Sequence, residues 1–164
     1  MPMKIAESPS ERHVLTVMVD NEPGILAKIT GLFTARGYNI DSLTVARITI
    51  VTNGPPQVID QIEAQLERLV PVHKVIDLTT AGPHVERELA LIKVAGVGEK
   101  RVEALRLADI FRARPVDTTT ESFIFEITGP PDKVDSFIAL MRELGLVEVG
   151  RTGIVGMMRG AQGI

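Results

Sequence analysis

The sequence lacks cysteine and tryptophan, and its 164 residues include only one tyrosine. A chain without cysteine can form no disulfide and has no thiolate nucleophile. The three histidines, His13, His73 and His84, lie too far apart in the sequence to show the spacing of metal ligands. We therefore predict no metal site and interpret each histidine as a surface or strand residue.

Long apolar runs are also missing. No segment approaches the ~20 residues that a membrane span needs, and the first twelve residues lack the apolar centre of a signal peptide. These features predict a cytoplasmic location and no membrane partner. A formal net charge of −3 provides no broad basic surface for nucleic acid. The expected partners are proteins or small molecules.

Aliphatic residues dominate what is present, since 45% of the chain is hydrophobic and only 4% is aromatic. Such a composition indicates a globular core of Val, Ile and Leu. A segment that begins G-P-P at Gly54 recurs, with the same Asp, Ala, Leu and Val positions, 75 residues later at Gly129. The repeat predicts two similar halves.

Each half shows the periodicity of strand, helix, strand, strand, helix, strand. Strands are predicted at 13–20, 39–46, 48–52, 72–78, 88–94, 115–119, 122–128 and 146–150, and helices at 24–36, 56–69, 99–113 and 131–144. This order predicts an α+β chain of two ferredoxin-like βαββαβ domains, at 12–79 and 84–164, with turn-forming residues at 79–83 between them. One face of such a sheet is left bare, so dimerisation is expected.

The first strand-to-helix turn carries the clearest functional signal. Pro23 suits the first turn of a helix, and Gly24 places no side chain over the amides of Gly24, Ile25 and Leu26. Free amides at a helix N-terminus can bind a carboxylate. The simpler alternative is an ordinary turn in which Asp20 or Asn21 caps the helix. The apolar stripe of Ile29, Leu32 and Phe33 that follows is interpreted as core packing.

The segment from Val19 to Val45 reads V-D-N-E-P-G-I-L-A-K-I-T-G-L-F-T-A-R-G-Y-N-I-D-S-L-T-V, and it resembles the start of an ACT domain, the amino-acid-sensing module. More narrowly, the chain resembles the small regulatory subunits of acetolactate synthase, also called acetohydroxyacid synthase. The likeness covers nearly the whole chain. It continues through Val72–Leu78, His84–Leu89, Arg106–Ala113 and Val149–Gly156.

The resemblance implies a homodimer formed through the ACT domains, with a feedback amino acid bound at the interface. Valine is the expected ligand, and leucine or isoleucine are possible alternatives. The implied effector-binding residues are Asn21, Gly24, Ile25, Leu26, Asn39 and Ile40. Side-chain oxygens of Asn21 and of Asn39 from the neighbouring subunit would accept from the ammonium, and the apolar residues would enclose the branched side chain. Asn39 also suits a plain helix C-terminal turn after Gly37.

The resemblance also implies a protein partner, the large catalytic subunit, which this chain would activate and make sensitive to valine in the biosynthesis of branched-chain amino acids. Thiamine diphosphate, Mg and FAD are expected in that partner, and no cofactor is expected in this chain. The contact surface is expected to include Gln61, Gln65 and Arg68, which otherwise form a solvated helix face.

One stretch conflicts with the predicted hairpin. Ser42 to Thr52 has strand-forming residues throughout and none of the Gly, Pro, Asn or Asp that a reversal favours. The family carries a polar loop here. We therefore predict that a mobile loop belongs between Ala46 and Arg47 and that the numbering closes over it; a real deletion would shorten the hairpin instead.

Three other classes of protein compete with this interpretation. A dinucleotide-binding enzyme would use Gly96-Val97-Gly98, but Arg101 occupies the third glycine position, and no catalytic residue is predicted. A DNA-binding regulator would need clustered basic residues, whereas acidic residues interrupt those at 101–114. A free-standing tandem ACT-type sensor is the main alternative. The glycine-rich C-terminal segment from Arg151 predicts either a docking tail or a strand that completes the second sheet and then frays.

Overall fold

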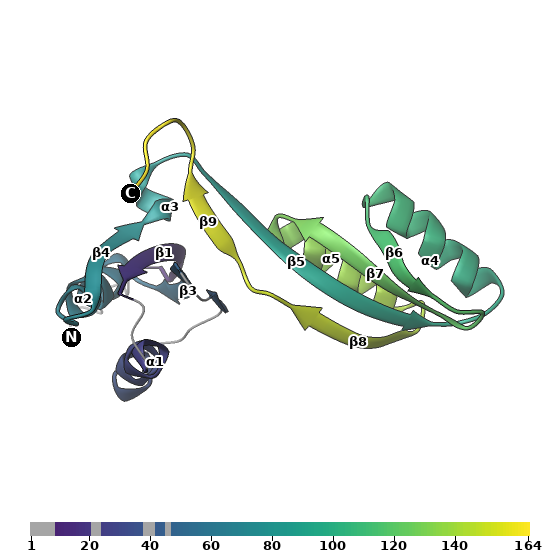
Figure 1. The fold of residues 1–164 in the computed structure, drawn as a ribbon, viewed down its shortest axis with the longest axis horizontal. Helices are drawn as coiled ribbons and strands as arrows, with labels where there is room; N and C mark the ends of the chain where they lie inside the picture. Colours follow the sequence, from purple (N-terminus) through teal and green to yellow (C-terminus); the bar gives the residue numbers. More distant parts are fainter. Residues whose placement is uncertain (1–8, 21–23, 38–41, 45–46) are drawn as a thin grey trace, which may run out of the picture. The chain divides into compact units, whose positions relative to one another are not determined.

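The structure is a computed structural model, and it describes residues 9–20, 24–37, 42–44 and 47–164. Its contacts divide the chain into two compact units. The first unit comprises residues 1–85 together with 156–164, and the second comprises residues 86–155. Figure 1 shows the elements of each in chain order.

The first unit has the predicted βαββαβ order. Its elements are β1 (Glu11–Val19), α1 (Ile25–Ala35), β2 (Ser42–Thr44), β3 (Ile48–Gly54), α2 (Pro56–Glu67) and β4 (Val72–Asp77). The strands form an antiparallel sheet in the order β2-β3-β1-β4. The β2–β3 hairpin pairs Thr44 with Thr49. Residues 45 and 46, where the sequence predicts a missing loop, lie outside the described residues.

Strand β1 is buried on both of its faces. Leu15 and Val17 point to the side of the sheet covered by α1 and α2, where they pack with Ile29 and Phe33 of α1. The predicted apolar stripe of α1 is therefore core. On the opposite face, Val14, Thr16, Thr49 and Val51 are also buried.

The opposite face of this sheet is in contact with the C-terminal segment of the chain. A Cβ built at Gly156 would lie 3.3 Å from a Val14 methyl and 2.6 Å from Leu78 Cδ1, so only glycine allows this close approach. The Arg47 guanidinium donates to the Gly156 carbonyl at 3.2 Å. Leu78 begins α3 (Leu78–Ala81), a short helix where the sequence predicts the end of a strand and the turn at 79–83.

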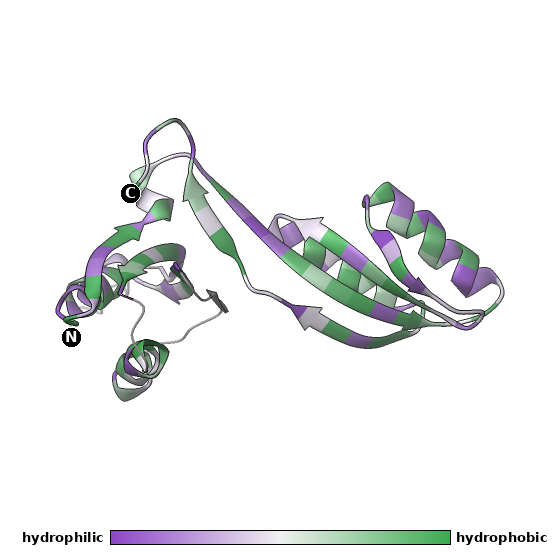
Figure 2. Cartoon of the chain, viewed as in Figure 1, coloured by the Kyte–Doolittle hydropathy of each residue, from purple (hydrophilic) through white to green (hydrophobic). Residues whose placement is uncertain are grey.

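The second unit repeats the plan. It contains α4 (Glu99–Ile110), β6 (Arg114–Thr118), β7 (Ser122–Gly129), α5 (Pro131–Arg142) and β8 (Leu146–Arg151). The chain passes from the first unit to the second in β5 (His84–Ala95), a central strand of the second sheet, and returns to the first unit in β9 (Val155–Met158), which pairs with β5. The strand order is β6-β7-β5-β8. The predicted fold, two ferredoxin-like domains in an α+β chain, is thus confirmed. Figure 2 shows that β5 begins with hydrophilic residues and continues as a largely hydrophobic strand.

Burial alternates along β5 because successive side chains point to opposite faces of a strand. Ala90, Ile92 and Val94 are buried against the helices, whereas Leu91 is exposed on the other face. The core is completed by contacts between aromatic rings, with Phe125 and Phe137 edge to face at 6.0 Å between centroids. The few aromatic residues of the chain are concentrated here.

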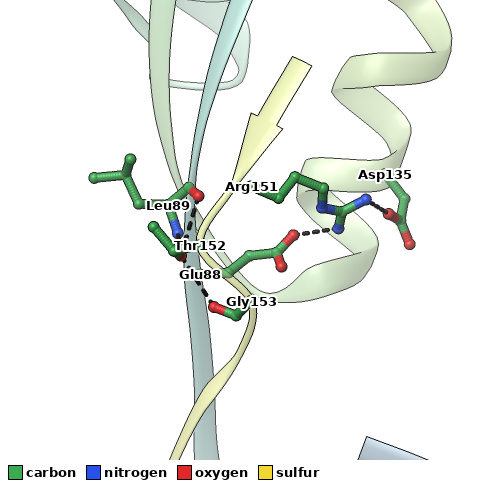
Figure 3. Close-up of polar contacts among 6 residues, drawn as sticks. All are labelled: Glu88, Leu89, Asp135, Arg151, Thr152 and Gly153. Carbon is green, nitrogen blue, oxygen red and sulfur yellow. Dashed lines mark hydrogen bonds and ion pairs between the residues drawn. The ribbon is translucent and has the colours of Figure 1, made fainter. Parts of the chain in front are cut away.

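A three-residue ionic network joins β5, β8 and α5. The Glu88 side chain is only 3% exposed, and its carboxylate accepts from Arg151. The other terminal nitrogen of Arg151 donates to Asp135 at 2.7 Å. Figure 3 shows the guanidinium between the two carboxylates. Partial burial of the guanidinium lowers the pKa of Arg151, but the hydrogen bonds and charges of Glu88 and Asp135 outweigh it and keep that pKa above its ordinary value. The buried Glu88 carboxylate in turn depends on this partner.

We expect Gly156→Val to destabilise the first unit, because its side chain would overlap Leu78 and Val14. Overpacking of this kind costs about 1–3 kcal/mol, which a urea unfolding curve of the full chain would measure. Gly163→Val is the matched control, since a Cβ at Gly163 meets no atom within 4 Å. Equal unfolding midpoints for the two variants would contradict the packing of this segment.

We expect Arg151→Met to destabilise the second unit by about 1–3 kcal/mol, because it leaves the buried Glu88 carboxylate without its hydrogen-bonded cation. Arg114→Met is the control, since it removes an exposed ion pair with Glu126 at 3.5 Å and such pairs contribute about 0–1 kcal/mol. Thermal and urea unfolding would compare the two variants. A larger loss for Arg114→Met would show that the buried network is unimportant.

Candidate ligand-binding site

Gly24 stands between β1 and α1 in the left-handed backbone conformation, with φ 83° and ψ 3°. Its carbonyl accepts the first hydrogen bond of α1, from the Lys28 amide at 3.0 Å, so Gly24 is the N-cap residue. A Cβ at this position would meet no atom within 4 Å. Glycine is therefore favoured by the backbone conformation, and not by lack of space.

Among the described residues, no side chain caps the N-terminus of α1 at Gly24. The first amides of a helix lack partners within the helix and carry the positive end of its dipole. The first turn of α1 also contains no acidic residue. The amides of Gly24, Ile25 and Leu26 are therefore chemically suited to a carboxylate, and the binding of one there stays a prediction.

The other predicted site residues divide into two groups. The Ile25 side chain is buried in the helix-side core, and Leu26 is partly exposed and packs against the same core. Leu26 thus offers apolar surface beside the amides, whereas Ile25 contributes mainly its amide. The remaining predicted residues, Asn21, Asn39 and Ile40, lie outside the described residues.

Two polar contacts hold the chain where it enters the turn. The Asp20 amide donates to the Pro71 carbonyl at 2.9 Å, and the Asp20 carboxylate lies 2.6 Å from His73 Nε2 of β4. The sequence indicates only a surface or strand residue at His73 and does not predict this pair. The two residues are 53 positions apart, and no local pattern connects them.

A second polar cluster lies between β1, β4 and α2. His13 Nδ1 is 2.6 Å from the Asp77 carboxylate, whose other oxygen accepts from the Thr79 amide at 3.0 Å and so caps α3. His13 and Asp77 thus join the end of β4 to β1 by a contact between buried side chains.

Glu63 of α2 lies near these charges. Its burial is the largest cause that raises its pKa above the ordinary value, and the charges of Asp77, Asp60 and Glu67 raise it further.

The described part of the chain offers little support for the enzymatic and DNA-binding alternatives. Gly98 is the N-cap of α4, but β5 before it pairs antiparallel with both β7 and β8, unlike the parallel sheet of dinucleotide-binding folds. On α4, Arg106 is paired with Glu103 at 2.8 Å. Within these residues no group of three or more His, Cys, Asp or Glu side chains is placed to hold a metal ion.

The helices of the described residues include none that is long and apolar enough to cross a membrane. Of the residues proposed for contact with a protein partner, Gln61 and Arg68 of the α2 region are exposed and Gln65 is half-buried. This face of α2 is therefore largely accessible.

Comparison with known proteins gives two family matches. Residues 15–74 match the family described as the AHAS small subunit-like ACT domain. Residues 87–160 match the family described as the small subunit of acetolactate synthase. The first unit of this tandem ferredoxin-like chain is thus an ACT domain.

Relatives resemble the chain over nearly their full length. A probable acetolactate synthase small subunit from Archaeoglobus fulgidus is 48% identical, covering 91% of this chain and 98% of that protein. The acetolactate synthase small subunit of Haemophilus influenzae is 45% identical, covering 93% and 99%. The crystal structure of the small subunit from Thermotoga maritima superimposes with a TM-score of 0.84 at 39% identity, covering 93% and 99%. The chain belongs to the family of acetolactate synthase small subunits.

The raised pKa of Glu63 predicts how stability depends on pH. A carboxyl group whose folded pKa exceeds its unfolded value stabilises the fold below the unfolded pKa, and this contribution is lost as pH rises through the folded pKa. We therefore expect Glu63→Gln to raise stability at pH 7, by no more than about 1 kcal/mol because the group is partly solvated.

The gain from Glu63→Gln should shrink as the pH is lowered below 4.5, the ordinary carboxyl pKa, because wild type is then protonated as well. Urea unfolding at several pH values measures it. Glu121→Gln serves as control, since Glu121 is exposed and is not among the charges that raise the pKa of Glu63. A gain that is constant with pH would contradict this account of Glu63.

Proposed function

We propose that the chain is the regulatory subunit of an acetolactate synthase, which binds the large catalytic subunit, activates it and makes it sensitive to feedback inhibition by valine. The proposal is supported by the N-terminus of α1 at Gly24, where no described side chain caps the helix, in a chain that covers nearly the full length of small-subunit relatives. The subunit itself carries out no chemistry. Thiamine diphosphate, Mg and FAD are assigned to the catalytic partner.

Valine would bind through its two charged groups and its side chain. The amides of Gly24, Ile25 and Leu26 take the carboxylate, where the helix dipole favours negative charge. The side-chain oxygens of Asn21, and of Asn39 from the second copy of a homodimer, accept from the ammonium. Leu26 and Ile40 contact the branched side chain. Leucine and isoleucine would be discriminated by only ~1–3 kcal/mol, as expected for ligands that differ by one methylene.

Regulation requires that valine bind two arrangements of the holoenzyme with different affinity. A coupling free energy of about 1–3 kcal/mol is typical and changes the activity several-fold. The accessible face of α2 with Gln61, Gln65 and Arg68 is the proposed contact with the catalytic subunit. A ligand at the start of α1 and a partner on α2 would then act on the two helices that cover the same sheet.

The test is acetolactate formation by a purified catalytic subunit, with and without this chain, across a valine titration. Wild type should activate, and valine should reverse the activation. Gly24→Asp should activate as well but respond to valine at least about tenfold more weakly, because its carboxylate competes for the amides and its Cβ strains the positive φ. Asn39→Ala should weaken the response to valine in the same direction.

Gly31→Asp is the matched control for Gly24→Asp. It adds the same charge to α1 at an exposed position where a Cβ meets no atom within 4 Å. Its valine response should equal that of wild type. Activation without any valine response would overturn the effector site alone. If no variant activates the enzyme, the chain is instead a tandem ACT-type sensor that acts on another protein.

A further inference from the structure

A cavity of about 270 Å³ lies within the first unit, between Arg47 and the segment that follows Gly156. Arg47 lines one side of it, and residues 157–158 and 160–164 line the other. All of these residues are described by the structure. None of the residues predicted for the effector site lines this cavity, so it is a separate place on the first unit.

The guanidinium of Arg47 is the charged group of the cavity, and it is only partly paired. Its Nη2 donates to the Gly156 carbonyl at 3.2 Å, which holds the side chain beside β9. Its Nε is buried and has no acceptor in the part of the chain that the structure describes. A buried donor without an acceptor destabilises a fold, so this nitrogen calls for a partner.

The other wall of the cavity is largely apolar. Met157, Met158 and Ile164 provide its hydrophobic side chains, and no residue that lines it is acidic. Because Met157 is exposed, a ligand can reach it from solvent. Methionine side chains also adapt to ligands of different shape. Apolar walls with a few polar groups that fix orientation are typical of small-molecule sites.

We propose that this cavity binds a small aliphatic carboxylate that lacks an amino group. The carboxylate accepts from Arg47, whose planar guanidinium matches its geometry, and the hydrocarbon part contacts Met157 and Met158. An amino acid is disfavoured, because its ammonium would lie near the Arg47 cation with no acidic side chain in the lining to neutralise it. Pockets for drug-sized ligands enclose about 300–1,000 Å³, so this smaller cavity suits an acid of roughly five carbons.

The test uses the six methionines of the full chain as reporters. Their methyl groups are labelled with carbon-13, and the signals of Met157 and Met158 are identified by substituting each with leucine. Isovalerate and its 2-oxo derivative should shift both signals in a saturable way. Isoamyl alcohol has the same carbon skeleton without the charge and should bind at least about tenfold more weakly. This comparison tests the charge in wild type, without any substitution.

Arg47→Met should weaken the binding of isovalerate at least about tenfold, because it removes the cation. Arg47→Lys should bind with intermediate affinity, since it keeps the charge but not the planar donors. Arg159→Met is the matched control. It removes an exposed arginine of the same segment that does not line the cavity, and it should bind isovalerate as wild type does.

Valine is titrated against Gly24→Asp, in which the proposed effector site is weakened, and it should leave the Met157 and Met158 signals in place. The cavity assignment would be overturned if neither acid gave a saturable shift, if the alcohol bound as tightly as isovalerate, or if Arg47→Met kept wild-type affinity. Saturable shifts with valine in Gly24→Asp would overturn the selection against an amino group. Each of these outcomes is independent of whether valine regulates the catalytic subunit.

Discussion

Burial of strand β1 on both faces is the constraint on which the first unit depends. Leu15 and Val17 pack against the helices, while Val14 and Thr16 are equally buried on the other side. A slip of one residue would exchange these two sets, placing Thr16 in an aliphatic core. The register of β1 is therefore strongly specified, and so is the point at which the chain leaves the sheet for the candidate site.

The two units complete the same plan in different ways. In the first, Gly156 and Leu78 lie against the sheet face that the helices leave open. In the second, the corresponding face keeps Leu91 exposed, beside Lys93 paired with Glu148 at 3.6 Å. The internal repeat therefore determines strand order and helix placement. Whether the sheet face opposite the helices is covered depends instead on segments outside the repeat.

The sequence predicts most of this fold because the relevant signals are local. The alternation in β5, the apolar stripe of α1 and the repeated G-P-P turns at Gly54 and Gly129 give the elements within a few residues of their observed ends. The contacts of Gly156 and the Asp20–His73 pair join distant positions, and no periodicity encodes them. The sequence does not predict α3 for the same reason. The N-cap residue of this short helix, Asp77, contacts His13, which lies 64 positions away in the sequence.

The candidate site shows the same division between local and distant signals. Glycine at the start of a helix can be read from the sequence, but its φ of 83° cannot. A Ser, Thr, Asp or Asn cap at this position would contribute about 1 kcal/mol and would occupy an amide. Under the proposed function, Gly24 leaves that stabilisation to the ligand, so binding of valine completes the helix N-terminus. The buried core behind Gly24, with Ile29 and Phe33, holds α1 against the sheet, so under this proposal the helix is already in place when the ligand binds.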